Sequence, residues 1–176
     1  VDKGLAAHRV DDLMVSMSWL GKAAKKNHAH AQAMLGYIYL RSDEVELALP
    51  LFEAAAKQKE PLALVELSSL YANGLGVDKN EAKALELLKL AVEQEYIPAY
   101  SALANAFESG LLGLAIDFTK ALYYYKQASD KGDATSTYRL MNAYQNGELG
   151  LEVDKVKEKA IKDYLEAFKK EERKNK

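Results

Sequence analysis

The sequence predicts an all-α protein built from repeated pairs of helices, and three observations lead to this fold class. The chain has 176 residues with only three prolines, and 49% of its residues are hydrophobic. Alanine and leucine, which favour helices, are abundant. Two segments recur in alternation, and one of the two spacings between them is constant, as expected for stacked repeats.

The first recurring segment, which we call helix B, carries two alanines seven residues apart. It is clearest in KALELLKLAVEQE (83–95) and KALYYYKQASDKG (120–132), which both begin with Lys-Ala-Leu. The same frame fits 47–59 and 159–171, and it fits 15–27 with Ser16 in place of the first alanine. We therefore expect five copies of one helix.

The second recurring segment, which we call helix A, occupies 31–42, 63–74, 99–110 and 136–147. Each copy places a small residue, a leucine and an aromatic residue four positions apart, a spacing that forms one stripe of a helix. The sets are Ala31, Leu35 and Tyr39; Ala63, Leu67 and Tyr71; Ala99, Leu103 and Phe107; and Ser136, Leu140 and Tyr144.

The turn from helix B to helix A has constant length. From the first helix B position to the next helix A leucine there are 19 residues in all four copies (16 to 35, 48 to 67, 84 to 103, 121 to 140). The loops from helix A to helix B vary in length instead, from the short 41–46 to 73–80, 109–119 and 146–158.

Gly74, Gly110 and Gly147 follow helix A, where a left-handed residue is expected. We interpret the Gly-rich loops as turns and not as phosphate-binding loops, because the preceding strand and the Gly-Lys-Ser/Thr ending are missing.

Composition narrows the function classes. The net charge of −2 and the pI near 6.0 argue against a surface that binds nucleic acid. No apolar run approaches the roughly 18 residues of a membrane span. Cysteine is absent, which excludes a disulfide frame, a thiolate metal site and a cysteine nucleophile. His28 and His30 do not share a helix face, and the serines lack an evident His-Asp frame. We expect no catalytic residue, no metal and no cofactor.

The second repeat carries a family resemblance. ALVELSSLYANGLGVDKNEAKALELLKLAVEQE (63–95) resembles the Sel-one-like repeats (SLR), a branch of the tetratricopeptide superfamily. The family pattern is met at Ala63, Leu67, Tyr71, Gly74, Gly76 and Val77, and Ser68 departs from it where the family has glycine. The resemblance covers nearly the whole chain. It implies an α/α solenoid, a superhelix of antiparallel helix pairs with about four and a half repeats and a concave face lined by helix A.

The resemblance also implies an adaptor or scaffold that binds a protein or peptide. Many bacterial members are secreted or periplasmic, so these compartments are slightly favoured over the cytoplasm. The expected organisation is one repeat domain over 1–176, with a half repeat at 1–30, helix pairs at 31–62, 63–98, 99–135 and 136–170, and a frayed tail at 171–176. The chain begins with Val1, so upstream repeats or a signal peptide remain open. Trp19 and Leu20 lack a preceding helix A, so self-association through this uncapped N-terminal end is also open.

The run Tyr123-Tyr124-Tyr125 cannot all face one core, because successive helical residues lie about 100° apart. In the repeat frame Tyr124 and Tyr125 match the pairs Trp19/Leu20, Leu51/Phe52 and Leu87/Leu88, which we expect to be core residues. Tyr123 matches Ser18, Pro50, Glu86 and Lys162. We therefore predict that Tyr124 and Tyr125 are core residues and that Tyr123 lies on the surface.

By analogy with tetratricopeptide folds, the inner face of helix A includes the residue two before each leucine and those two, five and six after it. The first two repeats offer an apolar patch there (Tyr37, Leu40 and Val65), and the later ones offer amides that can bond a peptide backbone. The predicted partner-binding residues are Tyr37, Arg41, Ser69, Asn73, Asn105, Glu108, Tyr123, Tyr138, Asn142 and Gln145. An immunity protein that binds a toxin through the loops 109–119 and 146–158 is an alternative. An enzyme or metal protein is the alternative from a different class.

Overall fold

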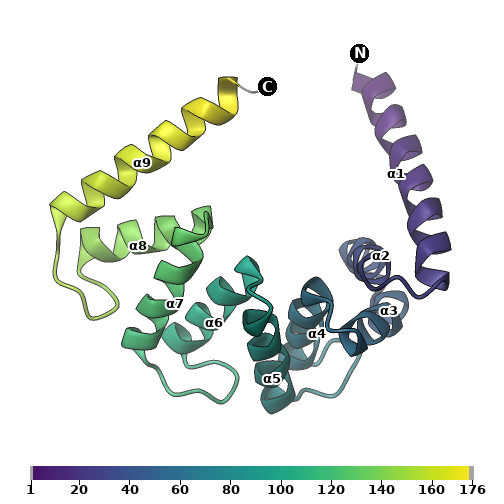
Figure 1. Ribbon diagram of the computed structural model, residues 1–176, viewed down its shortest axis with the longest axis horizontal. Coiled ribbons are helices and arrows are strands. Elements are labelled where there is room, and N and C mark those ends of the chain that lie inside the picture. Colours follow the sequence, from purple (N-terminus) through teal and green to yellow (C-terminus); the bar gives the residue numbers. More distant parts are fainter. Residues whose placement is uncertain (1, 175–176) are drawn as a thin grey trace. The chain divides into compact units, whose positions relative to one another are not determined.

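The computed structural model describes the backbone of residues 2–174 and the side chains of residues 14–163, 165 and 166. Within that part the secondary structure consists of nine helices, which confirms the all-α solenoid class (Figure 1). The helices are α1 (Asp2–Lys25), α2 (Ala29–Arg41), α3 (Val45–Lys57), α4 (Pro61–Asn73), α5 (Glu81–Glu93), α6 (Ile97–Ser109), α7 (Phe118–Asp130), α8 (Ala134–Asn146) and α9 (Lys155–Lys174).

Every predicted copy of helix A and helix B is present. Helices α2, α4, α6 and α8 are the helix A copies, and α1, α3, α5, α7 and α9 are the helix B copies. The two outer helices are longer than their repeats, since α1 begins at Asp2 and α9 runs from Lys155 to Lys174. The tail expected to fray from 171 is thus helical as far as Lys174, and 175–176 lie outside the described residues.

The constant B-to-A turn has one backbone geometry. The residue eleven positions after the first helix B position is left-handed in all four turns: Asn27 (φ 64°), Lys59 (φ 60°), Glu95 (φ 54°) and Gly132 (φ 94°). The next backbone N–H donates to a carbonyl of the preceding helix B, as in Glu60 to Ala55 (3.1 Å) and Asp133 to Ala128 (2.9 Å). A one-residue change in this turn would break that pairing, which explains the fixed length.

The variable A-to-B loops all close on the same joint despite their different lengths. The residue before each helix B donates its backbone N–H to the carbonyl of the preceding helix A aromatic: Glu44 to Tyr39 (2.9 Å), Asn80 to Tyr71 (2.8 Å), Asp117 to Phe107 (2.9 Å) and Asp154 to Tyr144 (2.8 Å). Gly74, Gly110 and Gly147 are left-handed, with φ of 68°, 65° and 70°, which confirms the predicted helix ends. Insertions therefore bulge outward without displacing the helices that they connect.

The chain forms two compact units, Val1–Gln94 and Glu95–Lys176. The assignment of the whole chain to one domain stays a prediction. In the first unit Ala33, Ala48, Phe52, Ala55, Ala63, Leu67 and Leu70 form a buried cluster. In the second unit the buried side chains include Ala99, Leu103, Phe107, Ala121, Tyr125, Ala128, Leu140 and Tyr144. Helix B alanines therefore sit against the helix A stripe, which permits close packing of the pairs.

The three tyrosines separate as predicted. Tyr125 is buried, and Tyr124 is half-buried with its ring stacked 5.8 Å from that of Phe107. Tyr123 is 56% exposed, and its ring lies edge-to-face with that of Tyr124 at a centroid distance of 5.1 Å. The equivalence to a core pair fails at Trp19, which is 67% exposed because no helix A packs over it in the described part of the chain.

Candidate functional site

In the first unit, the helix A face consists of α2 and α4. Tyr37 is 38% exposed, and Arg41, Ser69 and Asn73 are exposed as well. The Asn73 side-chain amide donates to the carbonyl of Ser69 at 2.9 Å, so its carbonyl oxygen remains the group that can accept from a ligand. These four predicted residues thus lie on the solvent side of their helices.

Arg41 has a charged neighbour on α4 that the sequence reading overlooked. Burial raises the pKa of Glu66, and the charge of the Arg41 guanidinium partly offsets that rise. Glu66 stands one residue before the α4 leucine, next to the inner positions expected from the repeat frame. One expected inner position, Ala33, is instead fully buried in the core of this unit.

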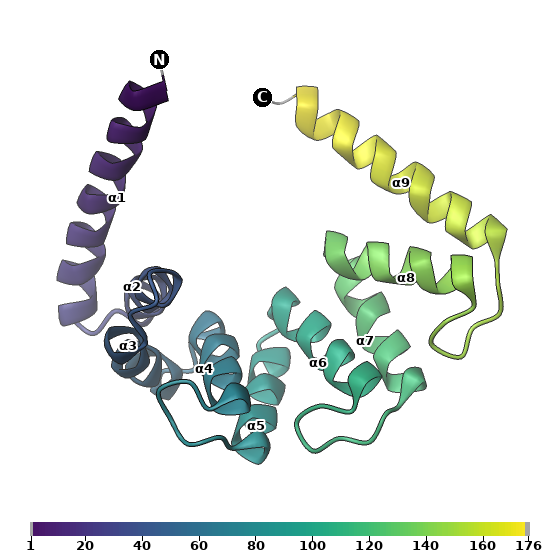
Figure 2. The ribbon, with the colours of Figure 1, turned by 180° about the vertical axis from the view of Figure 1, so that it is seen from behind.

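In the second unit, the helix A face consists of α6 and α8 (Figures 1 and 2). Asn105, Asn142 and Gln145 are exposed, and Tyr138 is half-buried. The exposed amides can both donate to and accept from an extended backbone. This part of the prediction therefore lies on an accessible surface.

Glu108 behaves differently from the other predicted residues, because it ties three helices together. Its carboxylate accepts from Arg139 Nε at 3.0 Å, from Arg139 Nη2 and from the Tyr125 hydroxyl at 2.7 Å. Arg139 Nη1 in turn donates to Glu148 at 2.6 Å. Glu108 thus positions α8 against α6 and α7, and a role in contacting a partner stays a prediction.

The hydrogen bonds around Glu108 shift the pKa of this carboxyl and of the Tyr125 hydroxyl. Burial alone would raise the pKa of Glu108, but the hydrogen bonds from Arg139 and Tyr125 and the charge of Arg139 outweigh burial and lower that pKa. Burial and the Glu108 carboxylate raise the pKa of the Tyr125 hydroxyl. The carboxylate is therefore ionised and the phenol protonated near neutral pH.

Arg139 was missed because the repeat frame assigned no role to the residue before the leucine. A signal exists in the sequence nonetheless. Opposite charges stand at the end of one helix A and just before the leucine of the next, as in Arg41 with Glu66 and Glu108 with Arg139. An alignment of the repeats therefore predicts which charged side chains of successive helix A copies lie close to each other.

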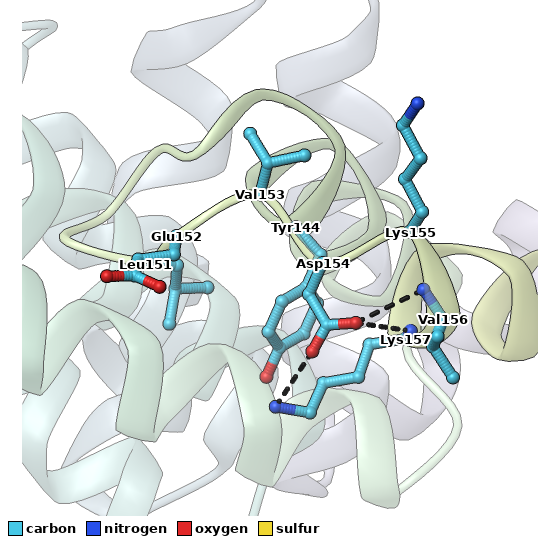
Figure 3. A pocket seen from close by; sticks show the side chains of 8 residues that line it. All are labelled: Tyr144, Leu151, Glu152, Val153, Asp154, Lys155, Val156 and Lys157. Atoms are coloured by element: carbon cyan, nitrogen blue, oxygen red, sulfur yellow. Dashed lines mark hydrogen bonds and ion pairs between the residues drawn. The ribbon is translucent and has the colours of Figure 1, made fainter.

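The variable loops of the second unit form a different surface. Figure 3 shows the α8–α9 loop, where a hollow of about 580 Å³ lies beside Tyr144 and Asp154. Asp154 accepts from the backbone N–H groups of Val156 (3.1 Å) and Lys157 (3.0 Å) and pairs with Lys157 Nζ at 3.3 Å. Asp154 is thus occupied by its own helix. Val153 (56% exposed) and Val156 (80% exposed) are accessible here, beside the exposed charged side chains of Glu152 and Lys155.

The α6–α7 loop also exposes apolar side chains, with Leu111 50%, Ile116 60% and Phe118 44% exposed.

The described histidines of the B-to-A turn, His28 and His30, form no chelating arrangement. His30 Nδ1 lies 3.0 Å from a Glu60 carboxylate oxygen. Among the described residues, no three His, Asp or Glu side chains gather as metal ligands would. No helix in the same part of the chain is long and apolar enough to cross a membrane.

Comparison with known proteins identifies relatives over most of the chain. It is 32% identical over 120 residues to the uncharacterized protein NMB1327 of Neisseria meningitidis, which covers 67% of this chain and 24% of that protein. It is 31% identical over 150 residues to the chitin synthase regulator SKT5 of Saccharomyces cerevisiae, covering 76% of this chain and 21% of the regulator. The chain therefore spans about a quarter or less of these relatives.

Solved structures agree on the fold. A Sel1 repeat protein from Oxalobacter formigenes aligns with a TM-score of 0.76 and 27% identity, over 85% of this chain and 60% of that one. The protective antigen c5321 of uropathogenic Escherichia coli, which displays an SLR fold, aligns with a TM-score of 0.70 and 26% identity, over 82% of this chain and 32% of that one. The Sel1 repeat model itself matches residues 9–28, 29–59, 61–96, 97–133 and 136–169, and the chain belongs to the Sel1 repeat family.

Proposed function

We propose that this chain is a non-catalytic adaptor module that binds a protein or an extended peptide on the exposed face of its helix A copies. Sel1 repeats are in general protein-interaction modules, and one relative is named as a regulator of chitin synthase. The family thus supports the class of function, and the choice of surface rests on the side chains of this chain.

The observation that carries the proposal is an exposed pair on every helix A. The small–Leu–aromatic stripe packs inward, whereas the residues two and six positions after the leucine are exposed in all four copies. The exposed pairs are Tyr37 and Arg41, Ser69 and Asn73, Asn105 and Ser109, and Asn142 and Asn146. Positions four apart lie on one helix face. Each unit therefore presents exposed polar side chains on these helices; the amides of Asn73 and Asn146 already donate one hydrogen bond each within their own unit.

The test is affinity capture with the triple variant Asn105→Ala/Asn142→Ala/Gln145→Ala, compared with the unchanged chain. All three side chains are exposed, so their truncation should leave the helices intact. A matched control truncates exposed helix B residues, Glu86→Ala/Lys89→Ala/Lys126→Ala. We expect a specific partner to be lost from the first variant and kept by the control. Retention by both variants, with unchanged circular dichroism, would refute the helix A surface.

A second candidate function uses the variable loops, as an immunity protein that covers a toxin would. The support is the set of exposed apolar side chains at Ile116, Phe118, Val153 and Val156. Isolated apolar residues are ordinary on a surface, but several of them at the two long loops of the same unit favour a docking site. The variant Ile116→Asp/Val153→Asp separates the candidates, because only loop binding predicts that it loses the partner retained by the amide variant.

A further inference from the structure

The side chain that covers the helix A aromatic differs between repeats. In the second repeat Lys83 Nζ lies 4.1 Å from the centre of the Tyr71 ring and donates to the Tyr71 hydroxyl at 2.6 Å. In the third, Lys120 Nζ lies 5.2 Å from the centre of the Phe107 ring. Both lysines immediately precede the first helix B alanine. The ammonium group caps the aromatic ring and gives this part of the surface a charge.

The first complete repeat has a leucine at that position. Leu47 precedes Ala48, is 50% exposed, and lines a groove of about 730 Å³ together with Tyr39. The groove lies between α1 and α3 with α2 at its base, and Leu35 and Leu51 complete its apolar floor. The exchange of lysine for leucine thus leaves this aromatic accessible in an apolar setting.

The rim of the same groove is positive. Lys22 and Lys25 line it from α1, and both also line an adjoining hollow of about 510 Å³ that contains Trp19 and Lys26. Trp19 is 67% exposed, and Lys22 Nζ lies 4.7 Å from the centre of its ring. Among the described residues, no aspartate or glutamate lines the groove or the hollow. Two exposed lysines therefore line the apolar floor of the groove, and a third, Lys26, lines the adjoining hollow.

The wall contributed by α1 allows close approach. A Cβ atom placed on Gly21 would meet no atom within 4 Å, so the helix backbone is open to a ligand at this point. A side chain or a helix entering the groove can lie against that backbone and reach Tyr39 and Leu47 below. The groove therefore accepts a bulky apolar group between its two lysines.

We propose that the α1–α3 groove is a docking site for an acidic amphipathic segment of a partner protein. Apolar side chains of the segment pack on Tyr39 and Leu47, and its carboxylates pair with Lys22 and Lys25. A second copy docked symmetrically would bring its own lysines against these lysines, and like charges across an interface are unfavourable. Charge complementarity therefore selects an acidic partner. This surface is distinct from the helix A face, so the inference goes beyond the proposed function.

The test uses the single tryptophan of the chain, Trp19, as a reporter beside the groove, because it lines the adjoining hollow that shares Lys22 and Lys25 with it. The probe is a synthetic helical peptide without tryptophan, with leucines along one face and glutamates elsewhere, and its match carries lysines in place of the glutamates. We expect the acidic peptide to shift Trp19 emission to shorter wavelength with saturation, and to bind at least about tenfold more tightly than the basic one at low salt. Added salt should narrow that difference, because the rim charges are exposed.

Two variants make the result specific. Leu47→Gln shortens the apolar floor without adding charge and should weaken acidic peptide binding several-fold, because an apolar contact is lost. Lys22→Glu/Lys25→Glu should reverse the preference in favour of the basic peptide. Lys89→Glu, on the exposed face of α5, is the control and should change nothing. The helix A amide variant should also bind normally, which distinguishes the two surfaces.

Three outcomes would overturn the proposal. Equal binding of the acidic and basic peptides would remove the role of the lysine rim. Unchanged binding by a folded Leu47→Gln variant would move the site away from the groove. A shift of Trp19 emission that follows protein concentration without peptide would assign the groove to a second copy of this chain.

Discussion

Replacing Ser136 with alanine should stabilise the protein, which is unusual for a buried substitution. Ser136 is fully buried in the first turn of α8, and its hydroxyl has no hydrogen-bond partner among the described residues. The three other copies of helix A carry Ala31, Ala63 and Ala99 at this position. The environment built by the repeat is therefore that of an alanine.

The magnitude follows from the lost hydration of the hydroxyl. A buried polar group without a partner costs about 1–3 kcal/mol, and alanine also has a higher helix propensity than serine by up to about 0.5 kcal/mol. The void left by one oxygen atom opposes this only slightly. The backbone N–H of residue 136 keeps its hydrogen bond to Asp133 Oδ2 at 2.7 Å. We expect a gain of about 1 kcal/mol and a rise in Tm of about 2–4 °C for a chain of this length.

The neighbouring Thr137 supplies a control of opposite sign. It is equally buried, but its hydroxyl donates to the Asp133 carbonyl at 2.7 Å and lies 2.8 Å from the Ser129 hydroxyl. Thr137→Ala removes both contacts and a buried methyl group, and should lower the free energy of unfolding by about 1–2 kcal/mol. Urea unfolding followed by far-ultraviolet circular dichroism measures both variants. A Ser136→Ala protein that is no more stable than the parent would refute the reasoning.

Three further predictions concern the packing of the repeats. The pKa of Glu108 is lowered in the folded protein, so this carboxylate stabilises the fold at neutral pH, and the stabilisation is lost as the pH falls below the ordinary pKa of 4.5. Glu108→Gln should therefore reduce the loss of stability between pH 7 and pH 3 in unfolding curves. A variant with the same pH dependence as the parent would contradict this prediction. Phe52 is fully buried in the core of the first unit, so Phe52→Ala should cost about 3–5 kcal/mol in chemical unfolding, and a cost below about 1 kcal/mol would show that the site collapses. Lys59 is held at φ 60°, so Lys59→Gly should raise the midpoint of unfolding by relieving about 1 kcal/mol of backbone strain, whereas the same change at the helical Lys89 should lower it.

The predicted face of helix A shows how far a repeat frame reaches. Asn105 and Asn142 are exposed as predicted, because their place relative to the leucine is a local property of one helix. Glu108 was assigned to the same face by the same rule, yet it pairs with Arg139, which lies 31 residues away in the chain. The rule describes directions around a helix axis, and it carries no information about the side chain that arrives from the next repeat.

The surface around Trp19 was anticipated only in part. The repeat frame places no helix A copy between residue 1 and Trp19, and Trp19 is 67% exposed in the described part of the chain. The groove between α1 and α3 was not foreseen, because its floor combines Leu35, Tyr39, Leu47 and Leu51 from two helices and its rim comes from a third. In the sequence, Leu47 appears only as one more apolar residue in an amphipathic helix.

The sequence by itself determined the helices, their order, the repeat register and the left-handed ends at Gly74, Gly110 and Gly147. Hydrophobic spacing and backbone preference are local properties, and the repeat presents the same pattern in several copies. It also determined which of the three consecutive tyrosines, Tyr123, lies on the surface. Only the tertiary structure decided that Glu108 links three helices, that the Ser136 hydroxyl has no partner among the described residues, and that Lys22 and Lys25 line an apolar groove. These outcomes depend on which side chains of different helices meet, and that meeting is set by packing geometry in three dimensions.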